Sequence, residues 1–250
     1  MNPPVMIMSL RRYIGVTGVL HAIGAADGPP LIPLALVGDY AGGATYLVIG
    51  VLAALLEAQR TGRGQVVDAA IVDGVSHLLA SIHSMLGAGR WTDHRGTNML
   101  DGGSPFYAVY ETADGRHMAV GALEARFFTE LLRLLKIDPD EFHPADQHNR
   151  DRWPFLRAKL SEVFGTRSQA EWTEVFAGTD ACVAPVVSLR EAAAHPQVMA
   201  RGSIIDSDGV LQPGAHHASP DIRLPGRDHR PRPVSIRARC SRPRVSTSTS

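Results

Sequence analysis

The sequence is short of three things: cysteine, net charge and long apolar runs. Cys182 and Cys240 are the two cysteines in 250 residues. They are too few for a disulfide framework and have no metal-like spacing to histidine, which is typical of a protein in a reducing compartment. Basic and acidic residues number 25 each, so no overall field attracts nucleic acid or a membrane. These shortages favour a soluble globular protein without a metal site.

Targeting and membrane signals are also missing. The apolar stretch 1–8 is too short for a signal peptide, and the positive charges of Arg11 and Arg12 follow it rather than precede it. The apolar run 42–56 is 15 residues long, below the roughly 20 that cross a bilayer. We therefore expect a cytoplasmic protein with no membrane partner.

Asp39 stands directly ahead of a Gly- and Ala-rich apolar stretch. Residues 42–56 have the composition of a buried helix, and Thr61-Gly62-Arg63-Gly64 provides a glycine stop. Asp39 therefore lies near the start of this helix. On local pattern alone, its carboxylate is predicted to cap orphan backbone N–H groups there.

The remaining sequence predicts an α/β arrangement followed by α+β structure. Residues 65–71 have the β-branched character of a buried strand, and Asp73 is suited to cap a helix over residues 74–86. Gly- and polar-rich residues 87–103 then indicate a connection between domains.

A hairpin is the strongest local prediction in the second half. Strands over 106–112 and 116–121 flank Asp114-Gly115, a pair that suits a two-residue turn. A helix over 125–135 follows. Two capping boxes and a short strand complete this part: Ser168 with Glu171, Ser188 with Glu191, and residues 182–187.

The expected fold is α/β over residues 1–100, a smaller α+β domain over 101–205 and a largely disordered tail over 206–250. Between Arg223 and Arg244 eight arginines stand against one acidic residue, and prolines interrupt any periodicity. A nucleic-acid-binding tail is the functional alternative, but no aromatic residues alternate with the arginines to stack on bases. The expectation is no nucleic-acid partner.

Several motifs together resemble the family III CoA-transferases, and most closely their α-methylacyl-CoA racemase branch. The likeness extends from about Tyr13 to Pro220. Its motifs are Asp27-Gly28-Pro29-Pro30, Val37-Gly38-Asp39, the segment from Glu57 to Ala69, Asp73-Gly74, Gly102-Gly103-Ser104-Pro105-Phe106-Tyr107, Asp114-Gly115-Arg116, Ala181-Cys182-Val183-Ala184-Pro185, His195-Pro196-Gln197 and Arg201-Gly202.

The resemblance implies chemistry at the α-carbon of a 2-methylacyl-CoA thioester. In the racemases a histidine and an aspartate act on opposite faces; Asp39 matches the aspartate, and Ser9 stands where the histidine belongs. Glu124 matches a glutamate that supports the aspartate, or is an ordinary acidic residue at a helix start. Tyr13 and Gly38 match substrate-binding positions. No separate cofactor is implied, because CoA is part of the substrate.

The helix that follows Asp39 is expected to supply a further element. N–H groups at its start, among Tyr40, Ala41 and Gly42, are predicted to be free to stabilise an enolate oxygen. Gly42 and Gly43 are equally suited to tight helix packing. His21, in an apolar context, is expected to be a structural histidine rather than a replacement base.

Both ends depart from the family pattern. Seven residues precede Met8 where the family has a long Rossmann-like portion. The resemblance therefore implies that residues 1–100 are a partial Rossmann-like large domain, in a truncated member with an aberrant tail. Three functions follow: a racemase homologue impaired at Ser9, a CoA-transferase with Asp39 as nucleophile, or a non-catalytic chain that pairs with a full-length relative. A homodimer or such a pairing is the expected assembly.

Overall fold

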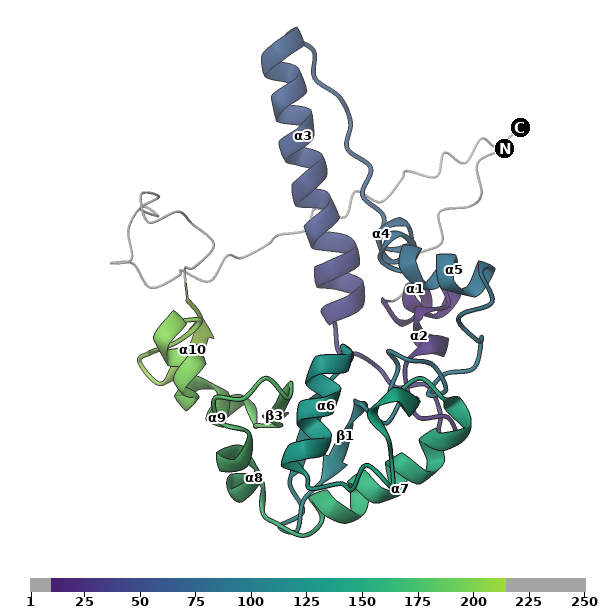
Figure 1. Cartoon of the computed structure of the whole chain (residues 1–250). Coiled ribbons are helices and arrows are strands. Elements are labelled where there is room, and N and C mark those ends of the chain that lie inside the picture. The colour runs from purple at the N-terminus through teal and green to yellow at the C-terminus, as the bar shows by residue number, and fades with distance from the viewer. Residues whose placement is uncertain (1–9, 215–250) are drawn as a thin grey trace, which may run out of the picture. The chain divides into compact units, whose positions relative to one another are not determined.

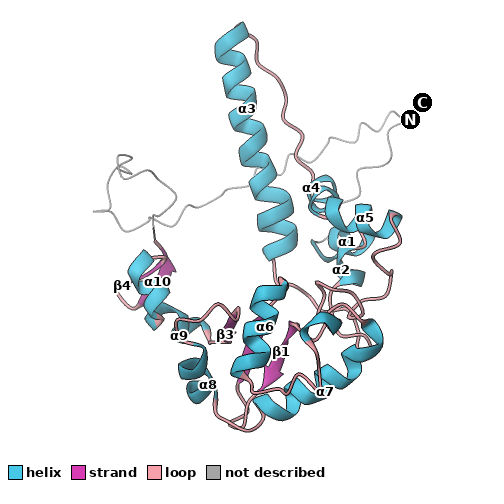
Figure 2. Ribbon diagram, viewed as in Figure 1, coloured by secondary structure: helices cyan, strands magenta, loops and turns pink. Residues whose placement is uncertain are grey.

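The computed structural model describes residues 10–214, and the chain divides into two compact units between Val186 and Val187. Figure 1 shows their elements, and Figure 2 shows that helices outnumber short strands. The chain is therefore of mixed α and β structure. The first unit contains α1 (Leu10–Val16), α2 (Val19–Ala22), the π-helix η1 (Leu36–Ala44), α3 (Thr45–Thr61), α4 (Ile71–Leu78), α5 (Ala80–Gly87), β1 (Tyr107–Glu111), β2 (His117–Gly121), α6 (Ala125–Leu134), the 3₁₀ turns η2 (Pro144–Asp146) and η3 (Arg150–Arg152), α7 (Trp153–Phe164), α8 (Gln169–Phe176) and β3 (Val183–Pro185).

A three-stranded antiparallel sheet in the order β1-β2-β3 forms one core of this unit. The predicted hairpin is confirmed, with Tyr107 opposite Gly121 and Glu111 opposite His117. Its turn is one residue longer than predicted: Thr112 donates its N–H to the Arg116 carbonyl, and Gly115 has a φ of +71°. A three-residue loop with a left-handed glycine is the next most common hairpin connection.

One face of the sheet, which carries Tyr110, Met118 and Val120, is covered by aromatic and aliphatic side chains from α6, α7 and α8. Phe106, Phe128 and Phe164 are completely buried, and Tyr110 stacks on Phe164 with ring centroids 5.2 Å apart. Trp172 donates its indole N–H to the Phe164 carbonyl at 2.9 Å. The helix predicted over 125–135 and the strand predicted within 182–187 are both confirmed as α6 and β3.

A second, smaller core joins α1, α2 and α4 through Ile14, Val19 and Val75. η1 packs against α4 through glycines. A Cβ on Gly74 would overlap the Gly42 carbonyl oxygen, and a Cβ on Gly42 would lie 2.5 Å from Val75 Cγ2. The role of Gly42 in tight helix packing is therefore confirmed.

Three predictions for residues 65–87 are wrong. Residues 65–70 form no strand, and Val66 is 93% exposed, because no neighbouring strand lies beside this segment within residues 10–214. Asp73 lies in the first turn of α4 instead of capping it, and Ala70 is the cap residue. The predicted helix after it is split into α4 and α5.

The helix that was expected to follow Asp39 begins before it, at Leu36, and is longer and more exposed than expected. η1 and α3 run continuously over Leu36–Thr61, 26 residues with a mean hydropathy of 1.7 in the most apolar window, of which 6% is buried. Gly62 ends α3 in the left-handed conformation, as predicted. The apolar run 42–56 was expected to be too short to cross a bilayer, but the helix that contains it is long enough. By length and composition alone this helix could cross a membrane, a test that core helices of soluble proteins also pass.

The second unit contains α9 (Leu189–Ala194), α10 (Pro196–Arg201), β4 (Ile204–Ser207) and β5 (Val210–Pro213). Both predicted capping boxes are present, at the starts of α8 and α9. β4 and β5 form a hairpin with Ile204 opposite Pro213, so the predicted disordered tail cannot begin at residue 206. Residues 215–250 lie outside the described range.

Candidate functional site

Asp39 lies inside η1, which winds more widely than an α-helix. Such π segments are rare and are frequent at functional sites. The Asp39 side chain is exposed, whereas Gly38 before it and Gly42 after it are buried. Small residues on the inner face of η1 therefore allow α4 to approach closely while the carboxylate faces outward.

Two local expectations for Asp39 are wrong. It does not cap the helix: Ala35 is the cap residue, and no side-chain cap hydrogen bond is present there. The Tyr40 N–H is not free either, because Asp39 and Tyr40 both donate to the Ala35 carbonyl, at 3.1 and 3.2 Å. Ala41 and Gly42 lie within the π-helix, whose N–H groups bond to carbonyls five residues earlier. Oxyanion stabilisation by these groups therefore needs the π segment to rearrange.

Tyr13 and Gly38 come from elements that pack against each other. Tyr13 is half-buried in α1, next to the buried Ile14, and α1 contacts both η1 and α4. Tyr13, Gly38 and Asp39 thus belong to one packed group of helices. Their substrate contacts stay a prediction.

Glu124 occupies the position before α6, with extended backbone at φ −78° and ψ 141°. Its side chain is exposed and makes no cap hydrogen bond to α6. Glu124 therefore does not cap α6 through a hydrogen bond, and its place at the helix start agrees with an acidic residue favoured by the helix dipole. Among the described residues no hydrogen bond or ion pair joins Glu124 to Asp39, so their partnership stays a prediction.

The charged surroundings of Glu124 centre on Cys182, which sequence reasoning noted only as part of a motif. Local desolvation raises the pKa of the Cys182 thiol, although the residue as a whole is exposed; Glu124 and Asp180 raise it further and Arg126 lowers it. Cys182 has a φ of +53°. The feature of the sequence that could have pointed to Cys182 is the Gly178-Thr179-Asp180 turn shortly before β3.

A cavity of about 420 Å³ lies beside this cluster. Its lining includes Arg126 and Phe127 at the start of α6, and Thr179 and Asp180 from the turn. The Arg126 guanidinium lies over the Phe127 ring, 4.3 Å from its centroid. Glu124 is exposed and precedes Arg126, which lines this cavity, by two residues in the chain.

His21 and Ser9 are the remaining candidate residues. His21 lies on α2 with Nε2 3.3 Å from the Asp93 carbonyl oxygen, which fits a structural histidine. Ser9 falls outside the described residues. Within residues 10–214 no three His, Cys, Asp or Glu side chains lie close enough to hold a metal ion.

Comparison with known proteins adds a family and its relatives. A sequence model of CoA-transferase family III matches residues 13–233, a range that continues past Pro220. Human α-methylacyl-CoA racemase is 42% identical over 197 residues, which cover 79% of this chain and 51% of that enzyme. The mouse enzyme is 40% identical and covers 86% of this chain and 55% of its own length.

Solved structures agree on the fold. A CaiB/BaiF family protein from Brucella suis superimposes with a TM-score of 0.63 at 24% identity, covering 90% of this chain and 58% of that protein. The chain thus spans about half the length of the relatives that it matches.

Proposed function

The chain belongs to CoA-transferase family III, and from that premise we propose that it is a homologue of α-methylacyl-CoA racemase acting on 2-methylacyl-CoA thioesters. The identity of 42% to the human enzyme carries this proposal. The position of Asp39 in an exposed, glycine-flanked π segment supports it. The reaction class is 1,1-proton transfer at the carbon next to the thioester carbonyl.

Proton removal is the step assigned to Asp39. The carboxylate takes the α-proton, the C–H electron pair enters the carbonyl system as an enolate, and a proton returned to either face restores the thioester. Inversion requires a second acid on the opposite face. Glu124 is proposed to support Asp39 in the assembled site, and Tyr13 and Gly38 to contact the substrate.

Ser9 is proposed to impair racemisation. A serine hydroxyl is a poor base near pH 7, because a general base works best when its pKa lies near the operating pH. With Asp39 as the remaining base, a deuteron from solvent returns to the face from which the proton left. The expected outcome is exchange without inversion, from one enantiomer.

The test is to incubate (2R)- and (2S)-2-methylacyl-CoA separately with the full chain in D₂O. Deuterium content is followed by mass spectrometry and configuration by chiral chromatography. We expect deuterium in one enantiomer, no inversion, and loss of exchange in Asp39→Asn. Glu174→Gln, which removes an exposed carboxylate on α8, is the matched control and should exchange normally.

The outcomes separate the alternatives. Inversion would show that Ser9 does not impair the enzyme, and exchange from both enantiomers would reveal a second base. Absence of exchange with measured thioester binding would remove Asp39 from the mechanism. Binding is followed independently by equilibrium dialysis of the labelled thioester.

A CoA-transferase activity is the alternative chemistry. There Asp39 would attack the thioester carbonyl and release CoA thiolate, leaving a mixed anhydride on its carboxylate. The exposure of Asp39 favours access of the acyl group. Hydroxylamine converts such an anhydride to a hydroxamate on the enzyme. A mass shift of the peptide containing Asp39 would support the transferase, and an unmodified peptide after turnover would exclude it.

The exposed helix α3 supports a third proposal, that a protein surface covers it. Leu47, Val48, Leu52, Leu55 and Leu56 are each more than 40% exposed, and a contiguous apolar surface of this kind marks an interaction site. We propose a homodimer or pairing with a longer family member in the cytoplasm, rather than a lipid contact. A chain without activity would then still act as a binding partner.

A further inference from the structure

Strand β1 has a free edge. Thr112 donates to the Arg116 carbonyl and Ala122 donates to the Phe106 carbonyl, both at 2.9 Å. Because hydrogen bonds alternate along an antiparallel strand, Val109 and Glu111 turn their N–H and C=O groups away from β2. Within residues 10–214 no donor or acceptor meets these groups.

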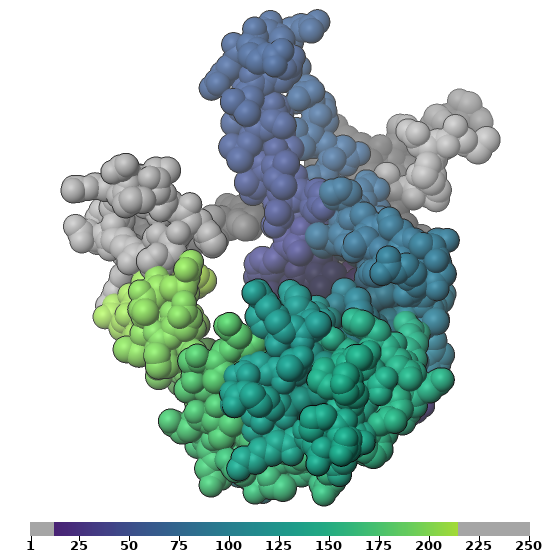
Figure 3. Space-filling model, viewed as in Figure 1, coloured from purple at the N-terminus to yellow at the C-terminus, as the bar shows by residue number. Residues whose placement is uncertain are grey.

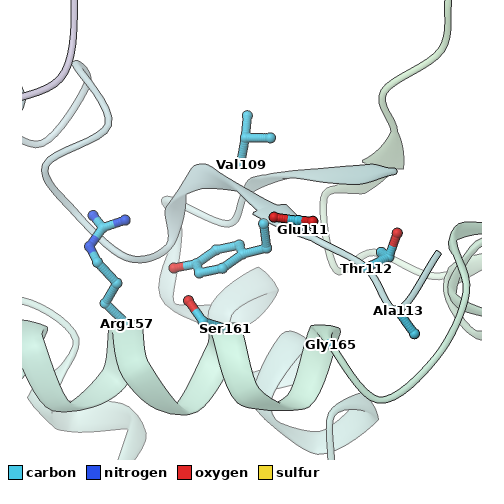
Figure 4. A pocket seen from close by; sticks show the side chains of 8 residues that line it. Val109, Glu111, Thr112, Ala113, Arg157, Ser161 and Gly165 are labelled. Atoms are coloured by element: carbon cyan, nitrogen blue, oxygen red, sulfur yellow. The ribbon is translucent and has the colours of Figure 1, made fainter. Parts of the chain in front are cut away.

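A groove runs along this edge and is bounded by α7. Val109 and Glu111 form its strand side, and Arg157, Ser161 and Gly165 form its helix side. Figure 4 shows Arg157 and Ser161 rising from α7 on the side of β1. The groove has a volume of about 480 Å³. Val109 is 57% exposed, so apolar surface borders the free backbone groups.

Arg157 gives one end of the groove a fixed positive charge. Its Nη2 donates to the carbonyls of Gly102 and Gly103, at 2.7 and 2.8 Å. A guanidinium carries five N–H donors, and those on Nε and Nη1 have no protein partner within the described residues. Glycines 102 and 103 precede β1, so Arg157 is held near the start of the strand. Glu111, at its other end, repels a second carboxylate.

A strand edge flanked by a helix is suited to β-augmentation, in which an extended peptide adds a strand and side-chain pockets select its sequence. We propose that the groove between β1 and α7 binds an extended peptide antiparallel to β1, with a carboxylate of the peptide at Arg157. The orientation follows from the charges: a carboxylate at the peptide's C-terminal end meets Arg157 at the start of β1.

The test uses a synthetic hexapeptide of alternating threonine and valine with a free C-terminal carboxylate. Backbone amide exchange in the full chain is measured by NMR with and without the peptide. We expect the Val109 and Glu111 amides to exchange quickly in the free chain and to become protected on binding. Two further peptides, one amidated and one amidated with a final aspartate, distinguish a C-terminal from a side-chain carboxylate.

Two variants separate the contribution of backbone hydrogen bonds to peptide binding from the contribution of the Arg157 charge. Val109→Pro removes an N–H that β2 does not use, and proline is tolerated on edge strands; it should abolish binding. Val66→Pro, in an exposed segment outside any strand, is the matched control and should bind normally. Arg157→Gln should weaken binding of the carboxylate peptide about tenfold and leave the plain amidated peptide unchanged.

Three results would overturn the proposal. The first is no protection at millimolar peptide in a chain whose amide spectrum shows the β1-β2 hairpin. The second is equal binding by Val109→Pro and the unaltered chain. The third is strong protection of Val109 and Glu111 without peptide, which would mean that another part of the chain already occupies the edge.

Discussion

At the residue scale, Cys182 reports directly on the surroundings of Glu124. Desolvation, Glu124 and Asp180 raise the pKa of its thiol, while Arg126 lowers it. Removing a neighbouring negative charge should therefore increase the thiolate fraction at pH 7.5. We expect Glu124→Gln to speed alkylation of Cys182 by iodoacetamide roughly two- to fivefold, and Arg126→Gln to slow it.

The measurement is mass spectrometry of the peptide that contains Cys182, which separates it from Cys240. Glu130→Gln is the control, because Glu130 pairs with Arg133 at 2.7 Å and is not among the charges that act on Cys182. Unchanged alkylation in Glu124→Gln would contradict the proximity of this carboxylate to the thiol.

Asp114 gives a second prediction at this scale. Hydrogen bonds from the Thr112 hydroxyl, at 2.6 Å, and from the Gln169 N–H lower its pKa below the ordinary value. A depressed pKa in the folded state contributes stability that is present at neutral pH and lost as pH falls through that pKa. The difference in unfolding free energy between the unaltered chain and Asp114→Asn should therefore shrink as pH falls below about 4. Urea titrations at several pH values measure it, and a difference independent of pH would contradict the assignment.

At the scale of elements, the contact between η1 and α4 depends on glycine. A Cβ at position 74 would overlap the Gly42 carbonyl, so we expect Gly74→Ala to destabilise the first unit by about 1–3 kcal/mol. A Cβ added to Gly87 in α5 would meet nothing within 4 Å. Gly87→Ala should be neutral or stabilising by up to about 1 kcal/mol.

Denaturant unfolding followed by circular dichroism tests both glycine variants. Because η1 also holds Asp39, Gly74→Ala should reduce α-proton exchange along with stability. Equal stability of the two variants would show that the helices separate easily and that the close approach is dispensable.

At the scale of the whole molecule, we expect the apolar surface of α3 to determine the oligomeric state of the chain. Figure 3 shows the atoms of this helix, coloured blue, widely uncovered. We expect the 26.9 kDa chain to sediment as a dimer or larger species at micromolar concentration. Leu52→Glu with Leu56→Glu should release monomers, because burial of a charge at an apolar interface is costly.

Sedimentation velocity makes this measurement, and Leu189→Glu, at a residue 87% exposed in the second unit, is the control. A stable monomer of the unaltered chain would contradict the protein-covered surface. Flotation with neutral lipid vesicles would instead indicate that lipid covers α3.

The sequence by itself determined the features that depend on near neighbours. The hairpin around Asp114-Gly115, helix α6, the strand β3, the glycine stop at Gly62 and both capping boxes need only short-range turn, cap and periodicity rules. The family was equally available, because its motifs are local runs of residues. Asp39 and Glu124 were predicted as site residues in this way, from motifs alone.

Only the tertiary structure decided the features that depend on distant residues. Residues 65–70 are as β-branched as a strand, but a strand requires a neighbour to pair with, and none lies beside them within residues 10–214. The packing of η1 against α4 depends on the close approach of Gly42 and Gly74, positions 32 residues apart. The charges around Cys182 and the groove beside β1 likewise combine segments separated in sequence. Side-chain type fixes what a residue can do, while packing fixes which partner it meets.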